Sequence, residues 1–165
     1  MIGLFIAAVT IFFGYIITTL IKFGIPESVS ATHYLWNKAF NNGGLLFTAT
    51  LVLVGFLVIP PWISVSPDDL TMCPFISSAA LVFVGCAAAF KEELTSSVHY
   101  TSAVIWATMV LIYATLTGCY MFVIFGAFFA LIGMLLNKWS NITFWLEIGA
   151  VLIMIDTIAY QLIGI

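Results

Sequence analysis

Residues 98–137 form an unbroken stretch of forty residues without a formal charge, VHYTSAVIWATMVLIYATLTGCYMFVIFGAFFALIGMLLN. A membrane-crossing helix needs ~20 predominantly apolar residues, because backbone N–H and C=O groups find no water inside the bilayer. At ~1.5 Å of rise per residue, one helix of this length would extend roughly 60 Å, twice the hydrocarbon thickness. The stretch therefore predicts two membrane-crossing helices, over residues 98–115 and 119–137, with a turn near Thr115-Leu116-Thr117-Gly118.

The rest of the chain has the same apolar character. Of its 165 residues, 64% are apolar and 7% are charged, and the mean hydropathy is +1.23. This composition leaves too little polar surface to cover a water-soluble globule, so the predicted partner is a lipid bilayer and not a nucleic acid. Further spans are predicted over residues 2–21, 44–59, 72–90 and 142–163, with Pro60-Pro61 ending the second. We therefore expect an all-α integral membrane bundle of six transmembrane helices in a single domain, 1–165.

The four lysines predict the orientation of this bundle. Lys22 and Lys38 flank the first connection between spans, Lys91 lies in the third connection and Lys138 in the fifth. Because cytoplasmic loops carry the excess of basic residues, these connections should face the cytoplasm and both termini should lie outside it. A secretory signal is the alternative interpretation of the first apolar segment, but no basic residue precedes that segment.

A short helix is predicted between the first two spans, over residues 29–40. Ser28 can cap this helix, and Asn41-Asn42-Gly43-Gly44 breaks it. Tyr34 and Trp36 are typical of the membrane interface. We expect the helix to lie along the cytoplasmic leaflet or to continue into the second span through a kink.

Small residues predict where helices approach closely. The third span is rich in Ala, Ser and Gly, which indicates that it lies at the centre of the bundle. Gly126, Ala130 and Gly133 form a groove on the fifth span. This groove could seat another helix of the same chain or a second copy in a homo-oligomer.

Both histidines lie in one repeated phrase, ESVSATHY at residues 27–34 and ELTSSVHY at residues 93–100. On a helix, the shared offsets 0, 3, 6 and 7 fall on about one third of the circumference, so one face would carry all four side chains. The repeat indicates either a duplicated two-helix unit or a coincidence. The candidate ligand or proton-relay residues are Glu27, His33, Tyr34, Glu93, His99 and Tyr100, with Ser30 and Ser96 as catalytic candidates.

Two further carboxyl groups lie within the last span. Glu147 should lie ~8 Å from the cytoplasmic end of that span, and Asp156 should lie deeper. A carboxylate at such depth is costly, so each is expected to be protonated, partnered or exposed to water. The two residues are nine positions apart, which turns them to opposite sides of the helix.

Three interpretations of the histidine phrases remain open. The imidazoles could pack at the membrane boundary, or they could bind a metal such as Zn²⁺ together with Glu93, its neighbour Glu92, or Glu147. They could also belong to a path for protons or ions. There is no His-Glu-x-x-His, Cys-x-x-Cys or Gly-rich phosphate loop, so no recognisable protease, redox or nucleotide site is predicted.

Two short motifs add a family resemblance. Ser28-Val29-Ser30-Ala31 before the second span and Val98-His99-Tyr100 opening a later one resemble small uncharacterised bacterial membrane proteins distantly related to the CREST superfamily. That superfamily includes alkaline ceramidases and adiponectin receptors, and the resemblance covers residues 26–107. It implies a seven-helix hydrolase bundle in which Ser, Asp and three His hold zinc near the cytoplasmic leaflet, with Ser30 matching the Ser and His99 one His.

The chain departs from that pattern in its histidines and its spans. It has two His in total, lacks the paired His of a final helix, and has six predicted spans. A family-type zinc site therefore cannot be completed from His alone. We expect a membrane protein that handles a lipid, ion or small solute at a polar cluster near the cytoplasmic leaflet. The alternatives are a metal-dependent hydrolase of a lipid amide or ester and a non-catalytic subunit of a membrane complex.

Overall fold

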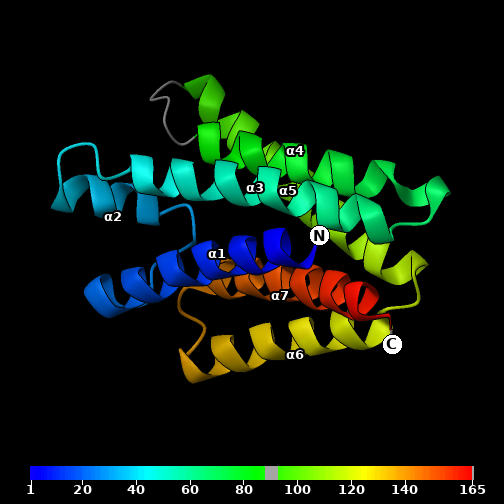
Figure 1. The fold of residues 1–165 in the computed structure, drawn as a ribbon. Coiled ribbons are helices and arrows are strands. Elements are labelled where there is room, and N and C mark those ends of the chain that lie inside the picture. Colours follow the sequence, from blue (N-terminus) through cyan, green and yellow to red (C-terminus); the bar gives the residue numbers. More distant parts are fainter. Residues whose placement is uncertain (88–92, 165) are drawn as a thin grey trace.

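The computed structural model describes residues 1–87 and 93–164, apart from the side chains of residues 93–96, and shows an all-α bundle (Figure 1). In this part of the chain there are seven α-helices and one short 3-10 helix, η1 (Asp68–Leu70). The helices are α1 (Ile2–Phe23), α2 (Thr32–Ala39), α3 (Leu45–Val65), α4 (Met72–Ala87), α5 (Glu93–Leu116), α6 (Tyr120–Leu136) and α7 (Ile142–Ile163).

Five segments are long and apolar enough to cross a membrane: α1, α3, η1 with α4, α5 and α7. The helix α6 is equally apolar but has only 17 residues. The expectation of an all-α protein with several candidate membrane spans is thus confirmed. The short helix predicted over residues 29–40 is present as α2 but begins only at Thr32. Its N-cap is Ala31, without a side-chain cap, so the predicted cap at Ser28 is wrong. Residues 88–90 of the predicted third span lie outside the described residues.

The long uncharged stretch breaks at the predicted turn. α5 ends at Leu116, and Gly118 takes a φ of 76°, which a glycine adopts without steric cost. The Cys119 N–H donates to the Ala114 carbonyl at 2.8 Å and ties the turn to the end of α5. α6 then begins at Tyr120, so residues 98–137 do form two helices.

The proline pair does not end α3, and the predicted end at residue 59 is wrong. The helix runs through Pro60 and Pro61 to Val65. Pro61 and Trp62 are buried in the bundle, so tertiary packing holds the helix across two residues that lack an N–H group. Two serine hydroxyls satisfy carbonyls near the end of the helix, and that of Ser64 donates to the Pro61 carbonyl at 2.8 Å. The Ser66 hydroxyl donates to the Trp62 carbonyl at 2.7 Å.

The helix with the most varied contacts is α3, not α4. α3 packs against α1, α2, α4 and α7, whereas α4 lies between α3 and α5. The small residues of α4 do permit close approach, because a Cβ added at Gly85 would lie 2.8 Å from the Leu51 Cβ. Small residues therefore predicted the close approach of α4 to its neighbours correctly, but the prediction that α4 lies at the centre of the bundle is wrong.

The small-residue groove of α6 seats α7 of the same chain. Gly126, Ala130 and Gly133 are buried, and a Cβ added at Gly126 would lie 2.7 Å from the Gly149 carbonyl oxygen of α7. A Cβ at Gly133 would collide with the Trp145 ring. Of the two predicted partners of this groove, the structure shows the helix of the same chain, since α7 occupies it.

The connections between helices gather at two ends of the bundle. In Figure 1 both termini lie toward the end that carries the α3–α4 and α5–α6 connections, and α2 and the α6–α7 connection lie at the other. Lys22 ends α1, Lys38 ends α2 and Lys138 lies between α6 and α7, so three lysines share one end. We call this end the lysine end and the other the terminus end. Lys91 lies outside the described residues.

Candidate functional site

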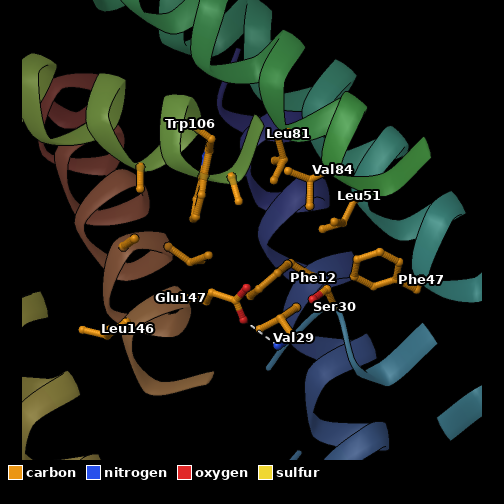
Figure 2. A pocket seen from close by; sticks show the side chains of 14 residues that line it. Phe12, Val29, Ser30, Phe47, Leu51, Leu81, Val84, Trp106, Leu146 and Glu147 are labelled. Atoms are coloured by element: carbon orange, nitrogen blue, oxygen red, sulfur yellow. Dashed lines mark hydrogen bonds between the residues drawn. The ribbon is translucent and has the colours of Figure 1, made fainter. Parts of the chain in front are cut away.

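A cavity of about 140 Å³ lies in the bundle toward the lysine end (Figure 2). Its walls come from α1, α3, α4, α5 and α7 and from the connection between α1 and α2. The described residues that line it are apolar, including Phe12, Phe47 and Trp106, with two exceptions: Ser30 and Glu147. The cavity therefore combines a mostly apolar wall with one carboxyl, one hydroxyl and the Trp106 indole N–H, which has no hydrogen-bond partner among the described residues.

Glu147 carries the carboxyl of this site. It is held on α7, and Figure 2 shows its side chain directed from that helix toward Val29 and Ser30. Its Oε2 accepts a hydrogen bond from the Val29 N–H at 2.5 Å. Within the described part of the chain, the other carboxyl oxygen makes no hydrogen bond. One oxygen of Glu147 is thus engaged, and the other keeps its capacity to accept.

The connection between α1 and α2 is fastened to the start of α7. The Asn141 side-chain amide donates to the Ile25 carbonyl at 2.8 Å, and the Phe144 N–H donates to the Glu27 carbonyl at 3.2 Å. The Val29–Glu147 bond completes this seam. The seam borders the cavity through Val29 and Glu147 and brings residues from opposite ends of the sequence into one site.

Ser30 belongs to a small hydroxyl pair at the same place. Its Oγ lies 3.0 Å from the Ser28 Oγ, and either hydroxyl could donate. The Ser28 Oγ also accepts the Ala31 N–H at 3.0 Å, which fixes the turn before α2. Ser30 alone of these three residues lines the cavity.

His33 lies behind the cavity wall. It is buried, its Nδ1 is 3.0 Å from the Gly44 carbonyl oxygen, and its ring packs edge-on against Phe47. A Cβ added at Gly44 would lie 2.5 Å from the imidazole, so the ring requires a glycine at that position. His33 thereby supports Phe47, which faces the cavity from α3.

His99 has a parallel arrangement on α5. Its Nδ1 lies 3.1 Å from the carbonyl oxygen of Val84, another cavity-lining residue. Each histidine is also in edge-to-face contact with the tyrosine that follows it, and both tyrosines, Tyr34 and Tyr100, are exposed. The two phrases therefore share their His–Tyr contacts, but their backbones differ. Residues 27–31 precede α2, whereas residues 93–100 lie within α5, so the single helical face expected for residues 27–34 does not form.

The other polar residues that the sequence singled out do not line the cavity where the structure describes them. Glu27 is exposed, and Asp156 is partly buried on α7 away from the cavity. The side chains of Glu93 and Ser96 lie outside the described residues, as does Glu92. Among the described side chains, no three His, Cys, Asp or Glu residues lie together as a metal site would require, so His33, His99 and Glu147 do not form such a group.

Comparison with protein-family models, curated proteins and solved structures gives no match. The resemblance to the CREST superfamily therefore stays a prediction, and the function has to be argued from the geometry of the chain. Sequence analysis singled out Ser30 and Glu147 but not their shared cavity. The apolar residues around them, such as Phe12 and Trp106, carry no sequence signal that distinguishes them from ordinary helix contacts.

Proposed function

We propose that the chain is a multi-pass membrane protein that binds a small apolar molecule, or the end of a lipid chain, in the cavity beside Glu147. In this proposal α6 also crosses the membrane, and the lysine end faces the cytoplasm according to the basic-residue bias. The observation that carries the proposal is the mostly apolar cavity with a single carboxyl at its edge. Apolar pockets with a few polar groups are typical of ligand sites.

The volume limits what the cavity can hold. An apolar cavity of roughly 150 Å³ stays dry and accepts a molecule the size of benzene. The cavity here, about 140 Å³, should accommodate a ring or a short alkyl chain of similar size. Leu146 lines it and is 54% exposed, so the cavity reaches the side of the bundle that lipid would cover. A ligand could enter from the bilayer.

The same walls favour binding over ion passage. Ion pathways are lined by rings of carbonyl oxygens or charged side chains, which replace the hydration shell of the ion. Here the polar groups of the described lining are the Ser30 hydroxyl, the Glu147 carboxyl and the Trp106 indole N–H, set among apolar side chains and without any ring of carbonyls or charges. Ser30, which the predicted CREST resemblance would make the family serine, lines this cavity, and a hydrolase is therefore the second candidate function.

A cavity-filling variant tests the proposal. Ala107 lines the cavity on α5, so Ala107→Phe should occupy it, whereas Ala127→Phe places the same ring on the exposed face of α6 as a control. Benzene should raise the melting temperature of the purified wild-type protein and of Ala127→Phe in detergent, because a ligand stabilises the state that binds it. Ala107→Phe should not respond. An equal response of all three proteins would contradict the proposal.

A further inference from the structure

We propose that the ligand of this cavity carries a protonated amine, which binds the Glu147 carboxylate and the Ser30 hydroxyl while its apolar body fills the remaining space. The inference rests on the cavity binding proposed above and adds the class of head group. It follows from the hydrogen-bonding capacity of Glu147, the distribution of charge around the cavity, and the hydrogen bond between the Ser28 and Ser30 hydroxyls.

The Glu147 carboxylate has unused acceptor capacity. An ionised carboxylate accepts through both oxygens and can take about four hydrogen bonds. The Val29 N–H occupies Oε2, and no described residue donates to the other oxygen. A ligand that donates hydrogen bonds would therefore complete this group, whereas a ligand that only accepts would not.

The charge around the cavity also calls for a cation. Among the described residues that line it, none is Lys, Arg or His, so Glu147 has no cationic partner there. Lys22 is engaged elsewhere, since its Nζ lies 3.8 Å from the centroid of the Phe40 ring and 4.8 Å from that of Trp36. A carboxylate within a membrane segment is stabilised by an opposite charge. Here that charge would come from the ligand.

The serine pair supplies a second acceptor beside the carboxyl. When the Ser28 hydroxyl donates to Ser30, the Ser30 oxygen still has one lone pair for a further donor. A primary ammonium group has three N–H donors, enough for Glu147 and Ser30 together. An anionic head group would instead place two negative charges side by side in an apolar site, which is unfavourable.

A matched set of probes tests the head group. n-Hexylamine, n-hexanol and n-hexanoate share one alkyl chain and differ only in that group. Binding to the purified full-length protein in a neutral detergent, measured by calorimetric titration near neutral pH, should follow the order amine, alcohol, carboxylate. We expect the amine to bind about tenfold or more tightly than the alcohol.

Two carboxyl variants assign the effect to its residue. Glu147→Gln keeps an oxygen that can accept the Val29 N–H but removes the charge, so its Kd for n-hexylamine should rise about tenfold while its Kd for n-hexanol stays unchanged. Asp156→Asn removes the other carboxyl of α7, which does not line the cavity, and should leave both Kd values unchanged. If Glu147→Gln fails to fold, Ser30→Ala should still weaken amine binding selectively.

The possible failures can be told apart. Equal binding of the three probes, abolished by Ala107→Phe, would overturn the amine inference and leave the cavity as a binding site. The same loss of amine binding in Asp156→Asn as in Glu147→Gln would also overturn the inference, since it would show a general charge effect. If none of the three probes binds, and benzene raises the melting temperatures of wild type and Ala107→Phe equally, the proposed function itself is wrong.

Discussion

The terminus end and the lysine end of the bundle treat their polar groups in different ways. At the terminus end, Trp62 and Tyr113 are 1% and 0% exposed and meet edge-to-face. The Tyr113 hydroxyl donates to Gln161 Oε1 at 2.8 Å, and its oxygen lies 2.9 Å from the Ser66 hydroxyl, which shares its one hydrogen between Tyr113 and the Trp62 carbonyl. At the lysine end, Glu147 lines a cavity and has one hydrogen bond among the described residues.

The difference indicates different roles for the Tyr113 hydroxyl, which is fully buried, and the Glu147 carboxyl, which lines a cavity. A hydroxyl that both donates and accepts within the chain contributes to holding α3, α5 and α7 together and offers nothing to a ligand. A carboxyl that lines a cavity and has only one oxygen engaged retains the capacity to accept a hydrogen bond from a ligand. The terminus end is therefore expected to determine stability, and the lysine end to determine binding.

The largest expected effect is the loss of the aromatic contact at the terminus end. Trp62→Ala should lower the free energy of unfolding by about 3–5 kcal/mol, because it removes a fully buried ring and leaves a cavity. Phe56→Ala on the same helix removes a ring that is 62% exposed and should cost much less. Unfolding in mixed micelles with increasing SDS measures the loss of stability in both variants. Equal losses would remove the distinction between the buried and the lipid-facing side of α3.

An intermediate effect is expected where the α1–α2 connection meets α7. Glu147→Leu removes the acceptor of the Val29 N–H and should lower the free energy of unfolding by about 1–3 kcal/mol, because a buried donor is left unpaired. Glu147→Gln keeps an acceptor and should be less destabilised in the same assay. If the two variants are equally stable, the Val29–Glu147 bond does not stabilise this seam.

The smallest expected effect concerns Asn141, which precedes α7. Asn141→Gly tolerates the positive φ of 56° but loses the hydrogen bond to the Ile25 carbonyl. Its free energy of unfolding should therefore be lower by about 0.6 kcal/mol. Asn141→Ala loses the same bond and adds backbone strain of about 1 kcal/mol or more. The expected order of stability is wild type, Gly, Ala. Hydrogen exchange at residues 25–29 should rise in both variants, and unchanged exchange would show that Asn141 does not hold this connection.

Prediction and structure differ at the end of α3, and the structure decides what the prediction left open at α6. The proline rule ended α3 too early, because a local rule does not include the buried packing of Pro61 and Trp62. The glycine-rich groove of α6 was located correctly, but its partner was left open between another helix of the chain and a second copy. That choice depends on where α7 lies, which no local pattern contains.

Apolar stretches and turn residues determined by themselves that this chain forms long helices, where most of them begin and end, and which few polar residues need an explanation. Those properties are local, since each depends on neighbours within a few turns of helix. Only the tertiary structure decided that Glu147 meets Val29, 118 positions away, and that both border one cavity with Ser30. Contacts of this kind depend on how five helices pack together, because the shape of the space between them belongs to no single segment.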